Sequence, residues 1–347
     1  MIEKVKFSDF RIIPDINSVR REAIDDDTYF SKAYSGYISN SRLKWIDPND
    51  GGTPQLFKSP PKLKTSSLTI GSRIHELLLQ PESFELAPKL GKPSAKLGDV
   101  MDFISDFLKD EIGLDESIKQ AAIKADYYVN SIDTKIEAIK EAWNDYSSKL
   151  NELISTDKTV RVVSDKDWDV INGCVESCNA NPDITNLLHP IGNVESYCED
   201  AFFMDYIVLY KNKYCATLKF KMKADNWTID FENKVVTLND LKTTSHPVQN
   251  FMKTDIGSFS HYSYARQMAV YSQILWYYCM KNYGVSKNIG WSLKANMLVV
   301  ETISNYWSKA YVVNPSQLKD GHRMLNELLC RVGYYDIFGW DKEIQFE

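Results

Sequence analysis

Three features that would assign a protein to a class at once are missing from this sequence. No run approaches the roughly 20 apolar residues that a membrane-spanning helix needs. No C-x-x-C pair is present, and the six scattered cysteines are typical of a reduced, cytosolic protein. No G-x-x-x-x-G-K-S/T motif is present either, so nothing supports a helicase. We therefore expect a cytoplasmic protein without membrane contact.

The composition excludes further classes. Hydrophobic residues make up 44% and charged residues 25%, which is ordinary for a globular protein and unlike a disordered, collagen-like or coiled-coil chain. The net charge of −6 excludes a uniformly basic protein that coats nucleic acid. Residues 40–75 differ from this average, because they contain six basic residues and only two acidic ones. Residues 1–15 contain no apolar core, so we expect no signal peptide.

The order of the expected elements predicts an α/β protein with a mixed sheet. Helical spacing of apolar residues predicts a helix that Pro81 ends, a long helical stretch, and two later helices. The polar turn KNK between two alternating segments predicts a hairpin. The expected helices cover 68–84, 97–180, 261–280 and 316–335, and the expected strands cover 201–210, 214–225, 234–244, SLKANMLVVET and YWSKAYVV.

We expect residues 1–36 to form an N-terminal arm and residues 37–347 to form a single domain. Within that domain, 96–190 would be a mostly helical insertion and 191–347 would supply the sheet core. Over 97–160 there are 14 acidic and 7 basic residues. A solvated helical face is the simpler interpretation of this acidic stretch, and a DNA-mimicking or partner-repelling role is the alternative.

The third expected strand ends in Asp240-Leu241-Lys242, and the period of two places Asp240 and Lys242 on one face. A carboxylate is a hard oxygen ligand suited to Mg²⁺. An ammonium group beside it can orient a water molecule or stabilise developing negative charge. By itself, D-x-K is usually an ordinary salt bridge.

The preceding expected strand adds a second carboxylate, Asp225. Only about 15 residues connect Asp225 and Asp240, so the two side chains can lie close together. Two such carboxylates repel each other unless a cation lies between them. One face of this strand would carry Leu218, Phe220, Met222 and Ala224, and the other Lys219, Lys221, Lys223 and Asp225. The lysines could contact phosphates, or they could simply be solvated.

Two further positions belong to the pattern. Gln267 and Tyr271 are four residues apart and therefore point from one face of the expected helix. His75 lies on a leucine-rich helix. Each of these residues alone would most often be a packed core residue, so the argument depends on their order in the chain.

That order, His, Asp, D-x-K and then Q-x-x-x-Y, resembles the PD-(D/E)XK nuclease superfamily and, more narrowly, the RecE-type exonucleases (exodeoxyribonuclease VIII) and their phage relatives. The resemblance covers about 38–90 and 195–340, and Ala224 stands where the family usually has proline. It implies a restriction-endonuclease-like core, with a mixed central β-sheet flanked by helices and a helical insertion. It rests on ISNSRLKWI (38–46), GSRIHELLLQPESF (71–84), KMKAD (221–225), LNDLKTT (238–244) and RQMAVY (266–271).

The resemblance also implies a metal site. Asp225, Asp240, His75 and the carbonyl of Leu241 would hold two Mg²⁺ or Mn²⁺ ions, and Lys242 would position the attacking water. An additional acidic residue is expected at the start of the first hairpin strand. Either Glu195 or Glu199 could supply it, and Glu199 is preferred because it leaves a strand of sensible length before the turn.

For DNA, the resemblance implies that Ser41 and Arg73 grip a terminal phosphate and that Gln267 and Tyr271 contact the backbone. No iron–sulfur cluster is expected, because only Cys279 and Cys330 follow Tyr271 and they lie far apart in the chain.

The activity that the resemblance implies is metal-dependent degradation of double-stranded DNA from its ends, 5′ to 3′, in phage or prophage recombination. A single-strand annealing protein is the implied partner, and a homo-oligomeric ring of three or four subunits the implied assembly. If a phage encodes the protein, its location would be the host cytoplasm. An endonuclease of the same fold and a catalytically silent DNA-end or partner-binding protein are the alternatives.

Overall fold

The structure is a computed structural model that describes residues 3–61, 66–87, 96–108, 113–151, 158–303, 305–342 and 344–347. The chain divides into two compact units, and each is described by itself. The first unit consists of Met1–Lys64, Ser177–Ile303 and Trp307–Glu347, and the second of Thr65–Glu176 and Ser304–Tyr306. None of the described helices is both long enough and apolar enough to cross a membrane.

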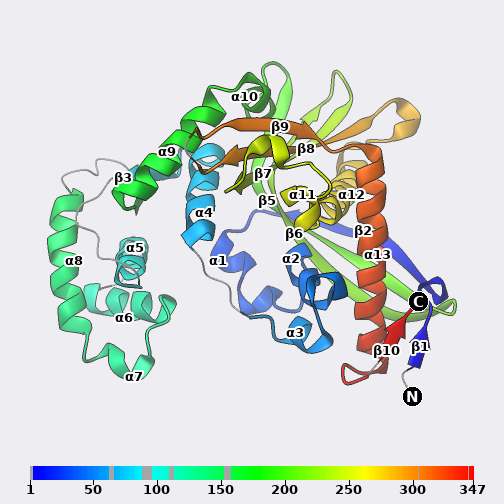
Figure 1. Ribbon diagram of the computed structural model, residues 1–347, viewed down its shortest axis with the longest axis horizontal. Helices are drawn as coiled ribbons and strands as arrows, with labels where there is room; N and C mark the ends of the chain where they lie inside the picture. The colour runs from blue at the N-terminus through cyan, green and yellow to red at the C-terminus, as the bar shows by residue number, and fades with distance from the viewer. Residues whose placement is uncertain are drawn as a thin grey trace. The chain divides into compact units, whose positions relative to one another are not determined.

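The first unit is built on a six-stranded mixed sheet (Figure 1). Neighbouring strands run antiparallel, except for β7 and β8, which run parallel. The expected mixed α/β class, with a central mixed sheet flanked by helices, is therefore confirmed. The strand order is β2 (Phe10–Glu22), β5 (Val194–Tyr210), β6 (Lys213–Asp230), β7 (Val235–Thr244), β8 (Ser292–Glu301) and β9 (Ser308–Val312).

The hairpin of β5 and β6 forms where the sequence predicted it. Lys211 and Asn212 connect the strands, with φ of +49° and +62°. Two successive left-handed residues are typical of the tight turn whose twist matches that of a hairpin. The predicted apolar face of β6 is also confirmed, because Leu218, Phe220, Met222 and Ala224 are all buried.

The expected N-terminal arm is wrong for residues 3–22. Phe10–Glu22 is an edge strand that pairs antiparallel with β5, and β1 (Glu3–Val5) pairs parallel with β10 (Ile344–Phe346). The sequence analysis missed β2 because its register shifts between Asp15 and Arg20, which interrupts the period of two. Pro14 also argues against a strand, yet an edge position tolerates it.

Two long helices, α12 (Tyr264–Tyr283) and α13 (Pro315–Phe338), pack against each other and against the sheet (Figure 1). Both were predicted, and Asn314 begins α13 with a capping box that includes Gln317. Gly321 permits their close approach, since a Cβ there would lie 2.0 Å from the carbonyl oxygen of Ala265.

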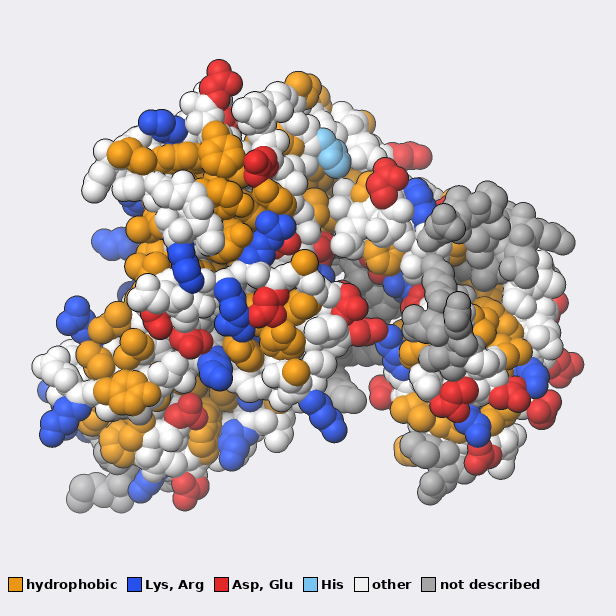
Figure 2. Space-filling view, turned by 180° about the vertical axis from the view of Figure 1, so that it is seen from behind, with side chains coloured by type: hydrophobic (Ala, Val, Ile, Leu, Met, Phe, Trp, Pro, Cys, Tyr) orange, Lys and Arg blue, Asp and Glu red, His pale blue; other side chains and the backbone are white. Residues whose placement is uncertain are grey.

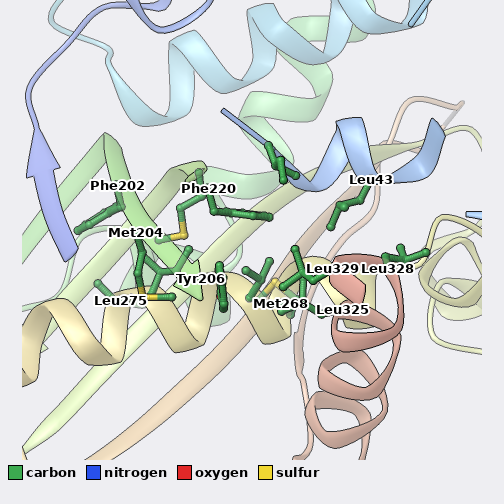
Figure 3. Close-up of a cluster of buried hydrophobic side chains, with 14 of the residues drawn as sticks. Leu43, Phe202, Met204, Tyr206, Phe220, Met268, Leu275, Leu325, Leu328 and Leu329 are labelled. Atoms are coloured by element: carbon green, nitrogen blue, oxygen red, sulfur yellow. The ribbon is translucent and has the colours of Figure 1, made fainter. Parts of the chain in front are cut away.

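Apolar side chains from the sheet and from these helices form the core of the first unit (Figure 3). Burying one such large side chain contributes about 1.5–3 kcal/mol, so this core supplies much of the unit's stability. Its members include Leu43, Phe202, Met204, Tyr206, Phe220, Met268, Leu275, Leu325, Leu328 and Leu329. Shorter helices of this unit are α1 (Asp26–Tyr29), α2 (Asn40–Leu43), α3 (Pro54–Lys58), α10 (Pro182–Leu188) and α11 (Ser258–His261).

The second unit is mostly helical and has a core of its own, which includes Val100, Ile104, Ile118, Ala121 and Trp143. It begins earlier in the chain than the expected insertion 96–190, and it ends at Glu176 within α9. Its elements are α4 (Ser66–Leu79), β3 (Phe84–Ala87), α5 (Lys96–Leu108), α6 (Leu114–Lys124), α7 (Val129–Ile132), α8 (Ile136–Asn151), β4 (Thr159–Val162) and most of α9 (Asp165–Asn179).

Candidate active site

Asp225 and Asp240 lie where β6 and β7 stop pairing. The last paired residues of the ladder are Asn226 and Asn239, so the two aspartates occupy the next opposed position. Backbone pairing is replaced there by a side chain, because Asp225 Oδ2 accepts a hydrogen bond of 2.8 Å from the backbone N–H of Leu241. The strands therefore separate at this point, with both carboxylates on one face of the hairpin.

Lys242 brings these two carboxylates together. Its ammonium group contacts Asp240 Oδ2 and lies 3.9 Å from Asp225 Oδ2. It also donates a hydrogen bond of 3.2 Å to the carbonyl of Leu241. Burial alone would lower the pKa of Lys242, but the charges of Asp240 and Asp225 raise it above its usual range. Lys242 is thus held as a cation beside two acids.

Glu199 supplies a third carboxylate. Its neighbours Cys198 and Asp200 pair with Asn226 and Ala224, but Glu199 itself has φ of +57° and leaves the ladder. A left-handed conformation is costly for a residue with a side chain, and outside turns such strained residues cluster at functional sites. Burial and the charge of Asp225 raise the pKa of Glu199 to about 7, against the opposing effect of Lys223.

Lys223 accounts for that opposing effect. Its ammonium group lies 2.7 Å from Glu199 Oε2 and also contacts Asp26. Burial likewise raises the pKa of Asp225, although Lys242 opposes the shift. Three carboxylates, those of Asp225, Asp240 and Glu199, thus lie beside the two ammonium groups of Lys223 and Lys242. Carboxylate oxygens are the ligands that Mg²⁺ prefers. The set fits a divalent cation. Glu195, the other candidate, is exposed and accepts a hydrogen bond from Tyr197.

Helix α12 covers the carboxylates with polar side chains. Gln267 donates a hydrogen bond of 2.7 Å to Asp240 Oδ1, which fixes the orientation of that carboxylate. Tyr271 follows one turn later, and burial raises its pKa, so its phenol stays neutral. Tyr264, one turn before Gln267, has its ring centroid 5.5 Å from the Lys242 ammonium. The sequence analysis missed Tyr264, although its spacing from Gln267 places it on the same helical face.

A ladder of three buried asparagines adjoins the aspartates. Asn239 donates a hydrogen bond of 2.7 Å to Asn226 Oδ1, and Asn296 on β8 donates one of 2.9 Å to Asn239 Oδ1. Asn226 in turn donates to Ser196 and to the carbonyl of Tyr197 on β5. The ladder thus joins four strands immediately beside the carboxylates. Its signal in the sequence was an asparagine next to each aspartate, in ADN and LND.

Ser41 lies on α2, which is held against α12 by a buried arginine. Arg266 donates a hydrogen bond of 3.0 Å to Asn40 Oδ1 and forms an ion pair of 2.8 Å with Asp47. Ser41 itself is exposed, and its hydroxyl lies 3.0 Å from that of Ser39. Ser41 therefore lies on a short helix that is bonded to α12, the helix that carries Gln267.

Arg73 and His75 belong to the second unit, on α4. Arg73 already has carboxylate partners there, because its guanidinium lies 2.7 Å from Glu76 and 3.7 Å from Asp102. These bonds weaken the case for Arg73 as the group that grips a phosphate. His75 is half-buried, and its role as a metal ligand stays a prediction.

Two of the three lysines of β6 fit neither alternative, because protein groups rather than solvent surround them. Lys221 is buried, donates a hydrogen bond of 2.6 Å to the carbonyl of Tyr29, and lies 4.1 Å from the centre of that ring. Lys223 is engaged by Glu199 and Asp26. Residues 26–34 fold over this face of β6, so only Lys219 of the three is exposed.

No protein-family model matches the chain, and no curated protein matches it significantly. Among solved structures, one that is similar is a crystal structure of a "Putative exonuclease" from Eubacterium rectale. It is 12% identical, covers 90% of this chain and 85% of that chain, and has a TM-score of 0.43. The fold itself defines a mixed α/β protein whose central mixed sheet is flanked by helices.

Proposed function

We propose that this protein is a metal-dependent deoxyribonuclease that hydrolyses phosphodiester bonds at the ends of double-stranded DNA. The observation that carries the proposal is the convergence of Asp225, Asp240 and Lys242 at the point where β6 and β7 separate. Glu199 adds a third acid, whose pKa is raised by burial and by the neighbouring charge of Asp225.

Each residue has a proposed task. Asp225, Asp240 and the carbonyl of Leu241 would hold Mg²⁺ or Mn²⁺, and Lys242 would orient the attacking water. Gln267 would keep Asp240 in one orientation, and Tyr271 would meet the DNA backbone. A bound divalent ion lowers the pKa of water and stabilises negative charge on a phosphate.

The narrower family and the direction of degradation are proposed from the sequence motifs and not from the geometry of the site. We propose a PD-(D/E)XK enzyme of the RecE type that degrades from the 5′ end and acts in recombination beside a single-strand annealing protein. His75 would be a further ligand of the metal site. Ser41 would grip the terminal phosphate, a role that Arg73 could share only by leaving its carboxylate partners.

The test compares two substrates. Linear duplex with labelled ends and a covalently closed circle of the same sequence are incubated with the protein in Mg²⁺ or in EDTA. We expect nucleotide release from the linear duplex in Mg²⁺ only, with the circle left intact. Nicking of the circle would favour the endonuclease alternative, and no cleavage of either DNA in Mg²⁺ or Mn²⁺ would contradict the proposal.

A further inference from the structure

A cavity of about 300 Å³ lies in the first unit, between the start of β6 and the end of α13. This volume is at the lower end of the range for small-molecule sites. The buried side chains of Leu218 and Val332 form its apolar floor. None of the carboxylates assigned to the candidate active site lines it.

The cavity carries a cluster of cations. Arg42, Lys58 and Lys219 all contribute to its lining, and Asp336 is the acidic residue among the lining groups. Lys58 and Lys219 are exposed, whereas Arg42 is half-buried. The formal charge of the lining is therefore positive although the whole chain is acidic. On the face shown in Figure 2, Lys and Arg side chains are interspersed with Asp and Glu.

Arg42 is held rigidly in this cavity. Its Nη1 donates a hydrogen bond of 2.7 Å to the carbonyl of Ser35, and its Nε donates one of 3.3 Å to the carbonyl of Phe57. The guanidinium lies 4.8 Å from the centre of the Phe57 ring, which stacks on Trp340 at 5.3 Å. Trp340 donates a hydrogen bond of 3.1 Å to Asp336 Oδ1, which fixes the far end of the stack.

Arg42 forms no ion pair within the part of the chain that the structure describes. Its hydrogen-bond partners are backbone carbonyls, and no acceptor for Nη2 is found among the described residues. Burial lowers the pKa of Arg42, and the charge of Asp336 opposes that shift only in part. A fixed planar guanidinium, together with the ammonium groups of two exposed lysines, matches the geometry and charge of a phosphate.

We propose that this cavity binds the phosphate group of a nucleotide, either a free mononucleotide or a phosphate of a single strand. The proposal of a phosphate site rests on the cavity and on the cations that line it. That the phosphate belongs to a nucleotide rests on the proposed function. Binding here needs neither a metal ion nor cleavage, so it can be measured when the candidate active site is disabled.

The experiment is isothermal titration calorimetry in EDTA with the Asp240→Asn variant, so that no cleavage interferes. The probes are dAMP, inorganic phosphate, and a short single-stranded oligonucleotide. A Lys58→Ala/Lys219→Ala double variant removes the two exposed cations, and a Lys213→Ala/Lys253→Ala double variant, in which both lysines are also exposed, is the matched control. Both changes are at the surface, so the fold should survive, which circular dichroism checks.

We expect dAMP to bind, inorganic phosphate to compete with it, and the cavity variant to lose about tenfold or more in affinity while the control stays within about twofold. If the oligonucleotide binds and dAMP does not, the result would support the site with a single strand as its ligand. If inorganic phosphate binds and neither dAMP nor the oligonucleotide does, the nucleotide assignment would be overturned. Equal affinities of the cavity variant and the control, or no binding of any probe, would overturn the site. Nuclease activity in Mg²⁺, measured separately, tests the proposed function.

Discussion

The position of Lys242 between two carboxylates is the residue-scale feature on which the candidate site depends. We expect Lys242→Ala to lower DNA cleavage by about 10²–10³-fold, because a positioned cation that stabilises developing charge is lost. Metal binding, measured by calorimetry, should persist, because the carboxylates remain. Lys253→Ala, an exposed lysine in the same unit, serves as the control. A Lys242→Ala variant that cleaves like the control would remove Lys242 from the site.

His75 allows a second residue-scale prediction. If its role is chemical, His75→Ala should lose most of the nuclease activity and keep a melting temperature near that of the original protein. If it is a packed residue of leucine-rich α4, the same change should mainly lower the melting temperature. Measuring cleavage and melting on one variant decides between these outcomes. Unchanged activity per folded molecule would contradict the metal-ligand role.

At the scale of elements, the asparagine ladder joins the strands that carry the carboxylates. Asn239→Ala removes bonds to both Asn226 and Asn296 and leaves buried amide groups without partners. We expect a loss of about 1–3 kcal/mol in the free energy of unfolding, measured by urea denaturation. A double-mutant cycle with Asn226→Ala should show coupling of about 0.5–3 kcal/mol. Additive effects would show that the ladder does not act as a unit.

The hairpin and the long helices could be predicted because their patterns are local. The period of two in β6 and the KNK turn both lie within one short stretch, and so does the helical spacing around Gln267. Strand β2 escaped prediction because Pro14 and the shift after Asp15 break its pattern. D-x-K was visible in the sequence, but the contact of Lys223 with Glu199 depends on which strands lie side by side. The role of Asn296 likewise arises only from tertiary packing, whereas the helical spacing of Tyr264 from Gln267 was a signal that the sequence analysis missed.

At the scale of the whole molecule, charge alone is a weak means of holding DNA. The net charge is −6, and binding through a few lysines and arginines weakens steeply with salt. We therefore predict a cyclic homo-oligomer of three or four subunits, the assembly that the motif resemblance implies, since enclosure would keep a long duplex bound. Light scattering in dilute solution measures the mass directly. A monomer that digests kilobase duplex in a single binding event would contradict the ring and leave the nuclease proposal intact.

The most direct test of the central claim compares two aspartate variants in one assay. Release of nucleotides from linear duplex is followed as Mg²⁺ is added to the original protein, to Asp240→Asn and to Asp255→Asn, whose aspartate is exposed and has no place in the site. The account predicts Mg²⁺-dependent release that Asp240→Asn loses by orders of magnitude and Asp255→Asn retains. Near-normal release by Asp240→Asn, or release that needs no divalent metal, would contradict it.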